Sequence, residues 1–176
     1  MKPYIRVDNH IYRFGVKASS TGSDVLTKVE TYEGHTFYVD EPKEVHGLGR
    51  APNPIEIFLS SLASCFIITL KLHSARLNLP INDVEAFAEG AFNIKGFILP
   101  QRFESGFTSI TLSARVEANT RCTELIKLLE TVTSGWVVGS TISNAMPINL
   151  KVEVVCLDGD GSLRNLKISK VVSKST

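Results

Sequence analysis

Cysteine is the residue type in this chain best suited to nucleophilic or redox chemistry, and it occurs three times. Cys65 lies in the middle of a long apolar segment that also carries serines, so its thiol is either a nucleophile or a small buried hydrophobic group. Cys122 falls in the first turn of a predicted helix, and Cys156 lies on the apolar face of a predicted strand. These two positions favour structural roles, which leaves Cys65 as the candidate reactive thiol.

The spacing of the cysteines predicts neither a disulfide framework nor a metal site. They are odd in number and far apart, and no C-x-x-C pair occurs. The four histidines show no metal-ligand spacing either. We therefore expect reduced thiols, a cytoplasmic protein, and no metal or cofactor.

The segment that carries Cys65 is predicted to be one long helix over residues 53–79. Asn53 is a favourable N-cap, Pro54 suits the first helical position, and Glu56 stands where the partner residue of a capping box is found. A helix of about 24 residues spans roughly 36 Å. Because it is apolar on most sides, it must be covered by a sheet, by other helices or by a second subunit.

Glu56 and Cys65 cannot meet within one straight copy of this helix. Their separation in the sequence places the two side chains about 180° apart around the helix and about 13 Å apart along it. Cooperation between the carboxylate and the thiol would need a bend, or a second copy of the helix packed alongside.

The remaining sequence predicts an α+β protein with antiparallel sheets. Residues 1–52 alternate and turn as strands that end in a loop containing glycine and proline. Residues 83–157 return to strand periodicity around a second helix, which breaks or ends at Gly135 and Gly139. These segments form one expected domain over residues 1–157.

Strand periodicity is clear at several places in this domain. Residues 12–16 alternate as one strand, and Gly34 marks a hairpin turn that needs a positive φ. Residues 108–118 and 148–156 place apolar side chains on one face and polar ones on the other. The polar and basic residues 158–176 are predicted to be a mobile extension or a peripheral strand.

Charge and hydropathy argue against nucleic acid and membrane as partners. The formal net charge of +1 gives no attraction to polyanions, and the N-terminus lacks the apolar core of a signal peptide. Glu56, Lys71, His73 and Arg76 interrupt the long helix, so we expect it not to span a bilayer.

Two runs of residues resemble the OsmC/Ohr family around its first cysteine: GLGRAPNPIE at 47–56 and LSSLASC at 59–65. The order of elements from about residue 12 to residue 155 is also similar, and residues 138–148 resemble the second motif of the family. The resemblance implies an OsmC-like fold, in which antiparallel sheets wrap around long central helices in an intertwined homodimer. Sites would then lie at the subunit interface.

The resemblance also implies a chemistry. In the family, a reactive cysteine attacks organic hydroperoxides or hydrogen peroxide and becomes a sulfenic acid. A second cysteine then closes a disulfide, and an arginine and a glutamate organise the pocket. Cys65 matches the attacking cysteine, and Glu56 matches the glutamate found in part of the family.

Two positions depart from the family pattern. The position that matches the second cysteine is Trp136, and the turn at residues 21–24, around Ser23, lacks the arginine of the Ohr branch. Arg50, in the loop before the long helix, is the candidate replacement.

Two functions remain open from the sequence. The first is a thiol-dependent peroxidase that uses Cys65, with Glu56 and Arg50 positioning the peroxide and an external small thiol or dithiol as reductant. The alternative is a non-catalytic OsmC-like protein that binds a small molecule or acts as a stress protein. The missing second cysteine and arginine favour the alternative, whereas Cys65 together with Glu56 favours the enzyme.

Overall fold

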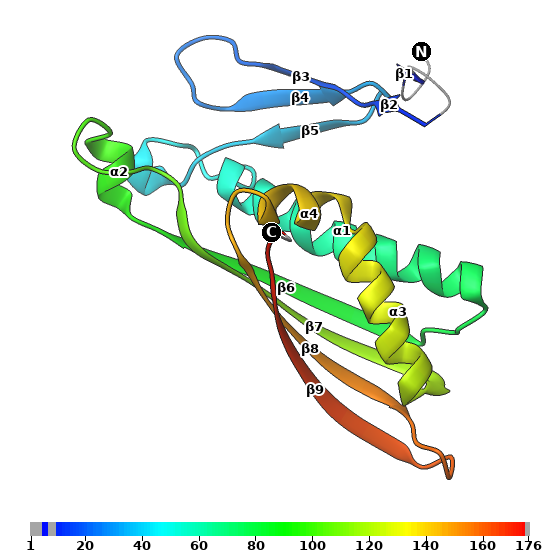
Figure 1. The fold of residues 1–176 in the computed structure, drawn as a ribbon. Helices are drawn as coiled ribbons and strands as arrows, with labels where there is room; N and C mark the ends of the chain where they lie inside the picture. The colour runs from blue at the N-terminus through cyan, green and yellow to red at the C-terminus, as the bar shows by residue number, and fades with distance from the viewer. Residues whose placement is uncertain (1–4, 7–9, 175–176) are drawn as a thin grey trace. The chain divides into compact units, whose positions relative to one another are not determined.

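In the computed structural model, which describes residues 5–6 and 10–174, the chain falls into two compact units, 1–58 and 59–176 (Figure 1). The described part of the first unit contains a two-stranded and a three-stranded antiparallel sheet. Their strands are β1 (Ile5–Arg6), β2 (Tyr12–Arg13), β3 (Val16–Ser19), β4 (Thr27–Thr31) and β5 (Thr36–Val39).

Both turns predicted in this unit are confirmed, and one predicted strand is divided. Gly34 closes the β4–β5 hairpin with a φ of 88°, and Ser23 lies exposed in the turn between β3 and β4. The strand expected over residues 12–16 is split into β2 and β3. The backbone carbonyl of Gly15 accepts a hydrogen bond from the Tyr32 N–H at 3.1 Å, so the chain changes pairing partner there.

The predicted long helix is α1 (Pro54–Leu77), and its capping box forms as expected. The Glu56 N–H donates to Asn53 Oδ1, and the Asn53 N–H donates to Glu56 Oε2, each at 2.8 Å. One stripe of α1 is buried, at positions four residues apart: Leu62, Phe66, Leu70 and Ser74. This spacing keeps one narrow face of the helix in the core.

Much of the apolar surface of α1 is left open within one chain. Ile68 is 58% exposed and Leu72 is 62% exposed. By length and composition alone, α1 is long and apolar enough to cross a membrane, a condition that core helices of soluble proteins also meet. Length and composition alone do not establish a span, so the expectation that α1 does not cross a bilayer stays a prediction.

The second unit is built on a four-stranded sheet in the order β6-β7-β8-β9. Its strands are β6 (Asp83–Phe92), β7 (Phe107–Arg121), β8 (Ile148–Leu157) and β9 (Leu163–Val172). The β6–β7 and β8–β9 pairs are antiparallel, whereas β7 and β8 are parallel. A short helix that the sequence patterns did not predict, α2 (Ile94–Ile98), lies between β6 and β7.

The parallel pair follows from the helices that connect its strands. α3 (Cys122–Gly135) and α4 (Val137–Ser143) carry the chain from the end of β7 back to the start of β8, as a parallel connection requires. Figure 1 shows α1, α3 and α4 on the same side of the sheet. The break predicted near Gly135 is confirmed at Trp136, which separates the two helices.

The alternation predicted for the strands is confirmed by their burial. In β7 and β8 the side chains that face the helices are buried: Ile110, Leu112, Ala114, Val116, Ala118, Ile148, Leu150, Val152, Val154 and Cys156. β9 pairs with β8 over ten positions, from Leu157–Leu163 to Ile148–Val172. Of the two alternatives for the C-terminal residues, the peripheral strand is therefore the one observed.

Candidate functional site

Cys65 lies in the middle of α1 and is half-buried at the edge of the core. Its neighbour in sequence, Phe66, is fully buried. Among the described residues, the polar contact of the sulfur is with Thr69 Oγ1, one helical turn later, at 3.9 Å. The thiol is thus held by a rigid element and keeps part of its surface open, as a reactive cysteine needs.

Glu56 is occupied by its structural role at the start of α1. Its carboxylate is exposed and accepts the Asn53 N–H of the capping box. Because α1 is helical without interruption from Pro54 to Leu77, the spacing to Cys65 remains half a turn around the helix and about 13 Å along it. The helix therefore does not bring this carboxylate to the thiol of its own chain.

Arg50 belongs to a loop that is organised by Asp40, a residue that the sequence patterns did not single out. The Asp40 side chain is 2% exposed and accepts three backbone N–H groups. Oδ1 accepts from Glu41 at 2.8 Å and from Leu48 at 3.3 Å, and Oδ2 accepts from Arg50 at 3.0 Å. The loop, which includes η1 (Lys43–Val45), is thus tied to the end of β5.

The same hydrogen bonds favour the ionised form of the Asp40 carboxyl group. Hydrogen bonding from the Arg50 N–H, and then from Glu41 and Leu48, lowers the pKa of Asp40, although burial acts in the opposite direction. The Arg50 guanidinium adds a smaller attraction to the carboxylate. A position just after a strand and before a glycine-rich loop was the available sequence signal for this anchor.

Trp136 fills the space beside Phe66. Its indole is fully buried, and the two rings meet edge to face with centroids 5.4 Å apart. Gly139 makes room for it, because a Cβ at that position would lie 2.2 Å from the indole. The Trp136 Nε1–H has no hydrogen-bond acceptor within the described ranges.

Cys122 and Cys156 form a disulfide, which corrects the expectation of three reduced thiols. α3 begins directly after β7, and β8 lies beside β7, so the two Cα atoms are 5.0 Å apart despite a separation of 34 residues. An odd number of cysteines did not exclude a bridge, because it leaves one free thiol. That free thiol is Cys65.

Comparison with known sequences gives a family match over residues 47–151, to the family described as OsmC-like protein. A curated relative is the uncharacterized protein YmaD of Bacillus subtilis, which is 34% identical over 89 residues. That alignment covers 49% of this chain and 56% of YmaD, so the chain spans about half the length of this relative.

Solved structures share the fold at lower identity. An OsmC like protein from Mycoplasma pneumoniae superposes with a TM-score of 0.66 at 18% identity, covering 82% of this chain and 96% of that one. An organic hydroperoxide resistance protein from Elizabethkingia anophelis gives a TM-score of 0.59 at 21% identity, covering 84% and 98%. The α+β fold with antiparallel sheets and a long helix is thus confirmed as OsmC-like. The family match covers more than half of the chain and includes Cys65, so this protein belongs to the OsmC-like protein family.

Proposed function

We propose that this OsmC-like protein is a thiol-dependent peroxidase that reduces organic hydroperoxides or hydrogen peroxide through Cys65. The Cys65 thiolate attacks the terminal peroxide oxygen, the O–O bond breaks, and the alkoxide or hydroxide leaves as an alcohol or water after taking up a proton. Cys65 is oxidised to a sulfenic acid. One external thiol then forms a mixed disulfide and releases water, and a second thiol restores Cys65 and leaves as the oxidised reductant.

The observation that carries this proposal is the state of the three cysteines. The pairing of Cys122 with Cys156 leaves Cys65 free, on a rigid helix, partly open, and within the family match. The organic hydroperoxide resistance proteins from Legionella pneumophila and Elizabethkingia anophelis share its fold, which supports a reaction with hydroperoxides.

A homodimer is part of the proposal. The open apolar face of α1, with Ile68 and Leu72, is suited to pack against a second copy of the chain. Two copies would also let Glu56 of one chain act on a peroxide bound at Cys65 of the other. Arg50 is proposed to supply the positive charge that favours the thiolate and orients the peroxide.

We place the protein in the cytoplasm, where small thiols and dithiols are the available reductants. Cytosolic thiols are normally kept reduced, so the Cys122–Cys156 bridge needs an explanation. Both residues are buried, at 7% and 1% exposure, which shields the bridge from attack by a small thiolate.

A direct assay tests the proposal. Wild type and Cys65→Ser are given cumene hydroperoxide or hydrogen peroxide, with dihydrolipoamide or dithiothreitol as reductant, and peroxide loss is followed. We expect turnover by wild type and a rate at least about a hundredfold lower for the variant, because the nucleophile is gone. The matched control is Cys122→Ala with Cys156→Ala, which keeps Cys65 and should keep activity. Equal rates for wild type and Cys65→Ser would refute the peroxidase.

A non-catalytic OsmC-like protein that binds a small molecule is the second candidate, and Trp136 is the observation that favours it. An indole at the position expected for the second cysteine cannot resolve a sulfenic acid, and it fills the space beside Phe66. This function predicts no peroxide turnover with any thiol.

A further inference from the structure

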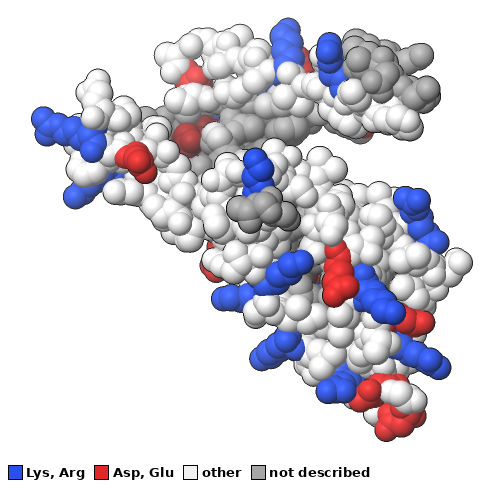
Figure 2. Space-filling view, viewed as in Figure 1, with Lys and Arg blue, Asp and Glu red and all other residues white. Residues whose placement is uncertain are grey.

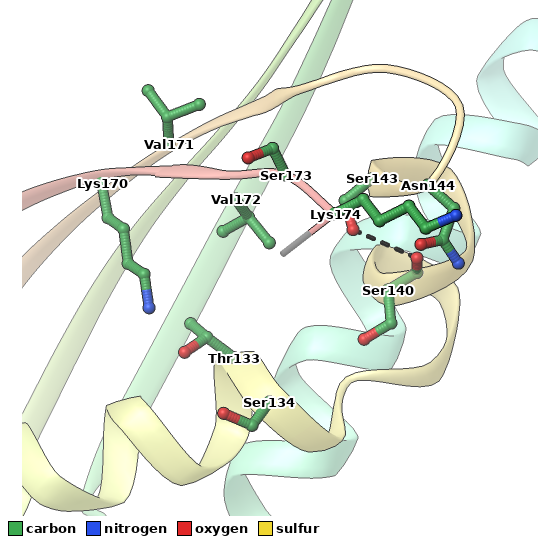
Figure 3. A pocket seen from close by; sticks show the side chains of 10 residues that line it. All are labelled: Thr133, Ser134, Ser140, Ser143, Asn144, Lys170, Val171, Val172, Ser173 and Lys174. Carbon is green, nitrogen blue, oxygen red and sulfur yellow. Dashed lines mark hydrogen bonds between the residues drawn. The ribbon is translucent and has the colours of Figure 1, made fainter. Parts of the chain in front are cut away.

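A polar groove runs between the end of α3, α4 and the end of β9 (Figure 3). Its volume is about 620 Å³, within the range of small-molecule sites. Its lining consists of Thr133, Ser134, Ser140, Ser143, Asn144, Lys170, Val171, Val172, Ser173 and Lys174. Cys65, Glu56 and Arg50 are not among these residues.

The charge of the groove is positive. Lys170 and Lys174 line it, and none of its ten lining residues is acidic. Neither ammonium group forms an ion pair with a side chain in the part of the chain that the structure describes. Figure 2 shows basic side chains, in blue, on the face of the second unit where β9 ends. Figure 3 shows Lys170 extending from β9 towards Thr133 and Ser134 at the end of α3.

Lys170 stands at an unusual position for a charge. It is opposite the buried Leu150 in the β8–β9 register, between Ile168 and Val172, so its side chain lies on the face of the sheet that carries the helices. An inward-facing charge on an edge strand discourages pairing with other sheets. That explanation does not account for the wall of hydroxyl groups across the groove from it.

The hydroxyl groups offer both acceptors and donors. Thr133 and Ser134 donate their protons to the Glu130 carbonyl, at 2.9 and 3.0 Å, and Ser143 donates to the Ser140 carbonyl at 3.1 Å. While these bonds are kept, the three oxygens present their lone pairs to a ligand and can accept from it.

Other side chains of the groove can both donate and accept hydrogen bonds. The side chains of Ser140, Asn144 and Ser173 have no hydrogen-bond partner among the described residues, so each can donate or accept. Acceptors and donors thus stand beside two cations.

We propose that this groove binds a small phosphate monoester that also carries hydroxyl groups. A phosphate group brings about −1.5 to −2 charges, which suits a groove with two cations and no acidic lining residue. Figure 3 shows the two ammonium groups at opposite ends of the groove, so the phosphate oxygens accept from Lys170 beside Thr133 and Ser134, and Lys174 adds attraction at longer range. Hydroxyl groups on the ligand would donate to Thr133, Ser134 and Ser143. Val172 is the apolar side chain that β9 turns towards the groove, because Val171 alternates to the other face of the sheet, so the site fits a hydrophilic molecule rather than an aromatic one. The site does not depend on the peroxidase reaction.

Trp136 provides a reporter for binding, since it is the single tryptophan of the chain. It joins α3 to α4, between Ser134 on one wall and Ser140 on the other. A ligand that draws these walls together should change the surroundings of the indole.

The test is a titration of full-length protein with glucose 6-phosphate, inorganic phosphate and glucose, followed by Trp136 fluorescence and by the amide NMR signals of Ser140, Asn144 and Lys170. We expect saturable binding of glucose 6-phosphate, binding of inorganic phosphate that is about tenfold weaker, and no response to glucose. Lys170→Gln should weaken binding of the sugar phosphate by about tenfold, because it removes a charge-assisted hydrogen bond, and Lys174→Gln, at the other end of the groove, should weaken it by less.

Matched controls are Lys151→Gln and Lys167→Gln on the opposite face of the same sheet, which should bind like wild type. A linear response to all salts would overturn the proposal, as would equal losses in the controls and in the groove variants. Tighter binding of inorganic phosphate than of the ester would also overturn it, because the hydroxyl wall would then have no role.

Discussion

Cys65 and Asp40 are the two side chains on which the candidate site depends most. Cys65 is the thiol left free when Cys122 and Cys156 pair. Asp40 gathers three backbone N–H groups and so fixes the loop that carries Arg50. The first residue is proposed to react, and the second sets the conformation of the loop that leads into α1.

Replacing Asp40 with alanine should release residues 41–50. The N–H groups of Glu41, Leu48 and Arg50 lose their shared acceptor, so their hydrogen exchange should speed up by roughly tenfold or more. Amide exchange followed by NMR measures this. The control is Asp83→Ala, whose carboxylate accepts only the N–H of the adjacent Val84 among the described residues. Unchanged exchange at Leu48 and Arg50 would contradict the anchoring role.

The loop should also loosen in acid. The folded pKa of Asp40 is lowered, so its contribution to stability is fully present above the ordinary carboxyl pKa of about 4 and is lost as the pH falls through the lower folded value. Exchange at Leu48, corrected for its intrinsic pH dependence, should therefore rise below about pH 4 in wild type. Asp40→Asn should show no such rise, and an identical acid response in both proteins would exclude Asp40 as the cause.

At the scale of elements, the break between α3 and α4 lies beside the part of α1 that carries Cys65. Trp136 interrupts the helices, packs on Phe66 of α1, and occupies space that Gly139 leaves free. The disulfide joins the first residue of α3 to β8, so both ends of α3 are fixed.

Gly139→Ala should destabilise the protein although alanine is the better helix former. The new Cβ would lie 2.2 Å from the indole, and overpacking of this kind costs about 1–3 kcal/mol. Urea unfolding measures the loss. Gly159→Ala is the matched control, since a Cβ added there would meet nothing within 4 Å, and it should unfold like wild type. Equal free energies of unfolding for the two variants would show that the Trp136 indole is not tightly packed against Gly139.

Removing the disulfide should be costly. The bridge closes a loop of 34 residues, and replacing Cys122 and Cys156 with alanine should lower the free energy of unfolding by about 2–4 kcal/mol. Thiol titration gives an independent check. Wild type denatured without reductant should show one thiol per chain, and a value of three would contradict the pairing.

Local patterns predicted the elements well, and contacts between distant segments poorly. Residues close in the sequence form the capping box at Asn53 and Glu56 and the alternation in β7 and β8. Both could therefore be predicted from the sequence. The Cys122–Cys156 bridge and the parallel β7–β8 pair depend on how α3 and α4 carry the chain back, which no local pattern specifies. Asp40 was missed because its partners follow up to ten residues later in an irregular loop.

At the scale of the whole molecule, the open face of α1 is the feature that most needs a partner. Length and composition alone would also allow a membrane span, whereas the proposed homodimer would bury this face against protein. In the proposed site, Glu56 can act at Cys65 only if two copies meet, because the two residues lie on opposite sides of one helix.

Leu72→Asp should therefore convert a dimer into a monomer. A carboxylate on this face would be desolvated without a partner, which costs far more than one packed leucine gains. Sedimentation of wild type and variant measures the mass. Leu163→Asp, at an exposed position at the start of β9, should remain a dimer. A wild type that sediments as a stable monomer would refute the assembly.

The most direct measurement of the central claim is the site of oxidation after a single equivalent of hydroperoxide. The protein is treated with the peroxide and then with dimedone, which traps sulfenic acids, and its peptides are analysed by mass spectrometry. The account predicts dimedone on the peptide that contains Cys65 and none on those that contain Cys122 or Cys156. An unlabelled Cys65 under conditions where peroxide is consumed would contradict it.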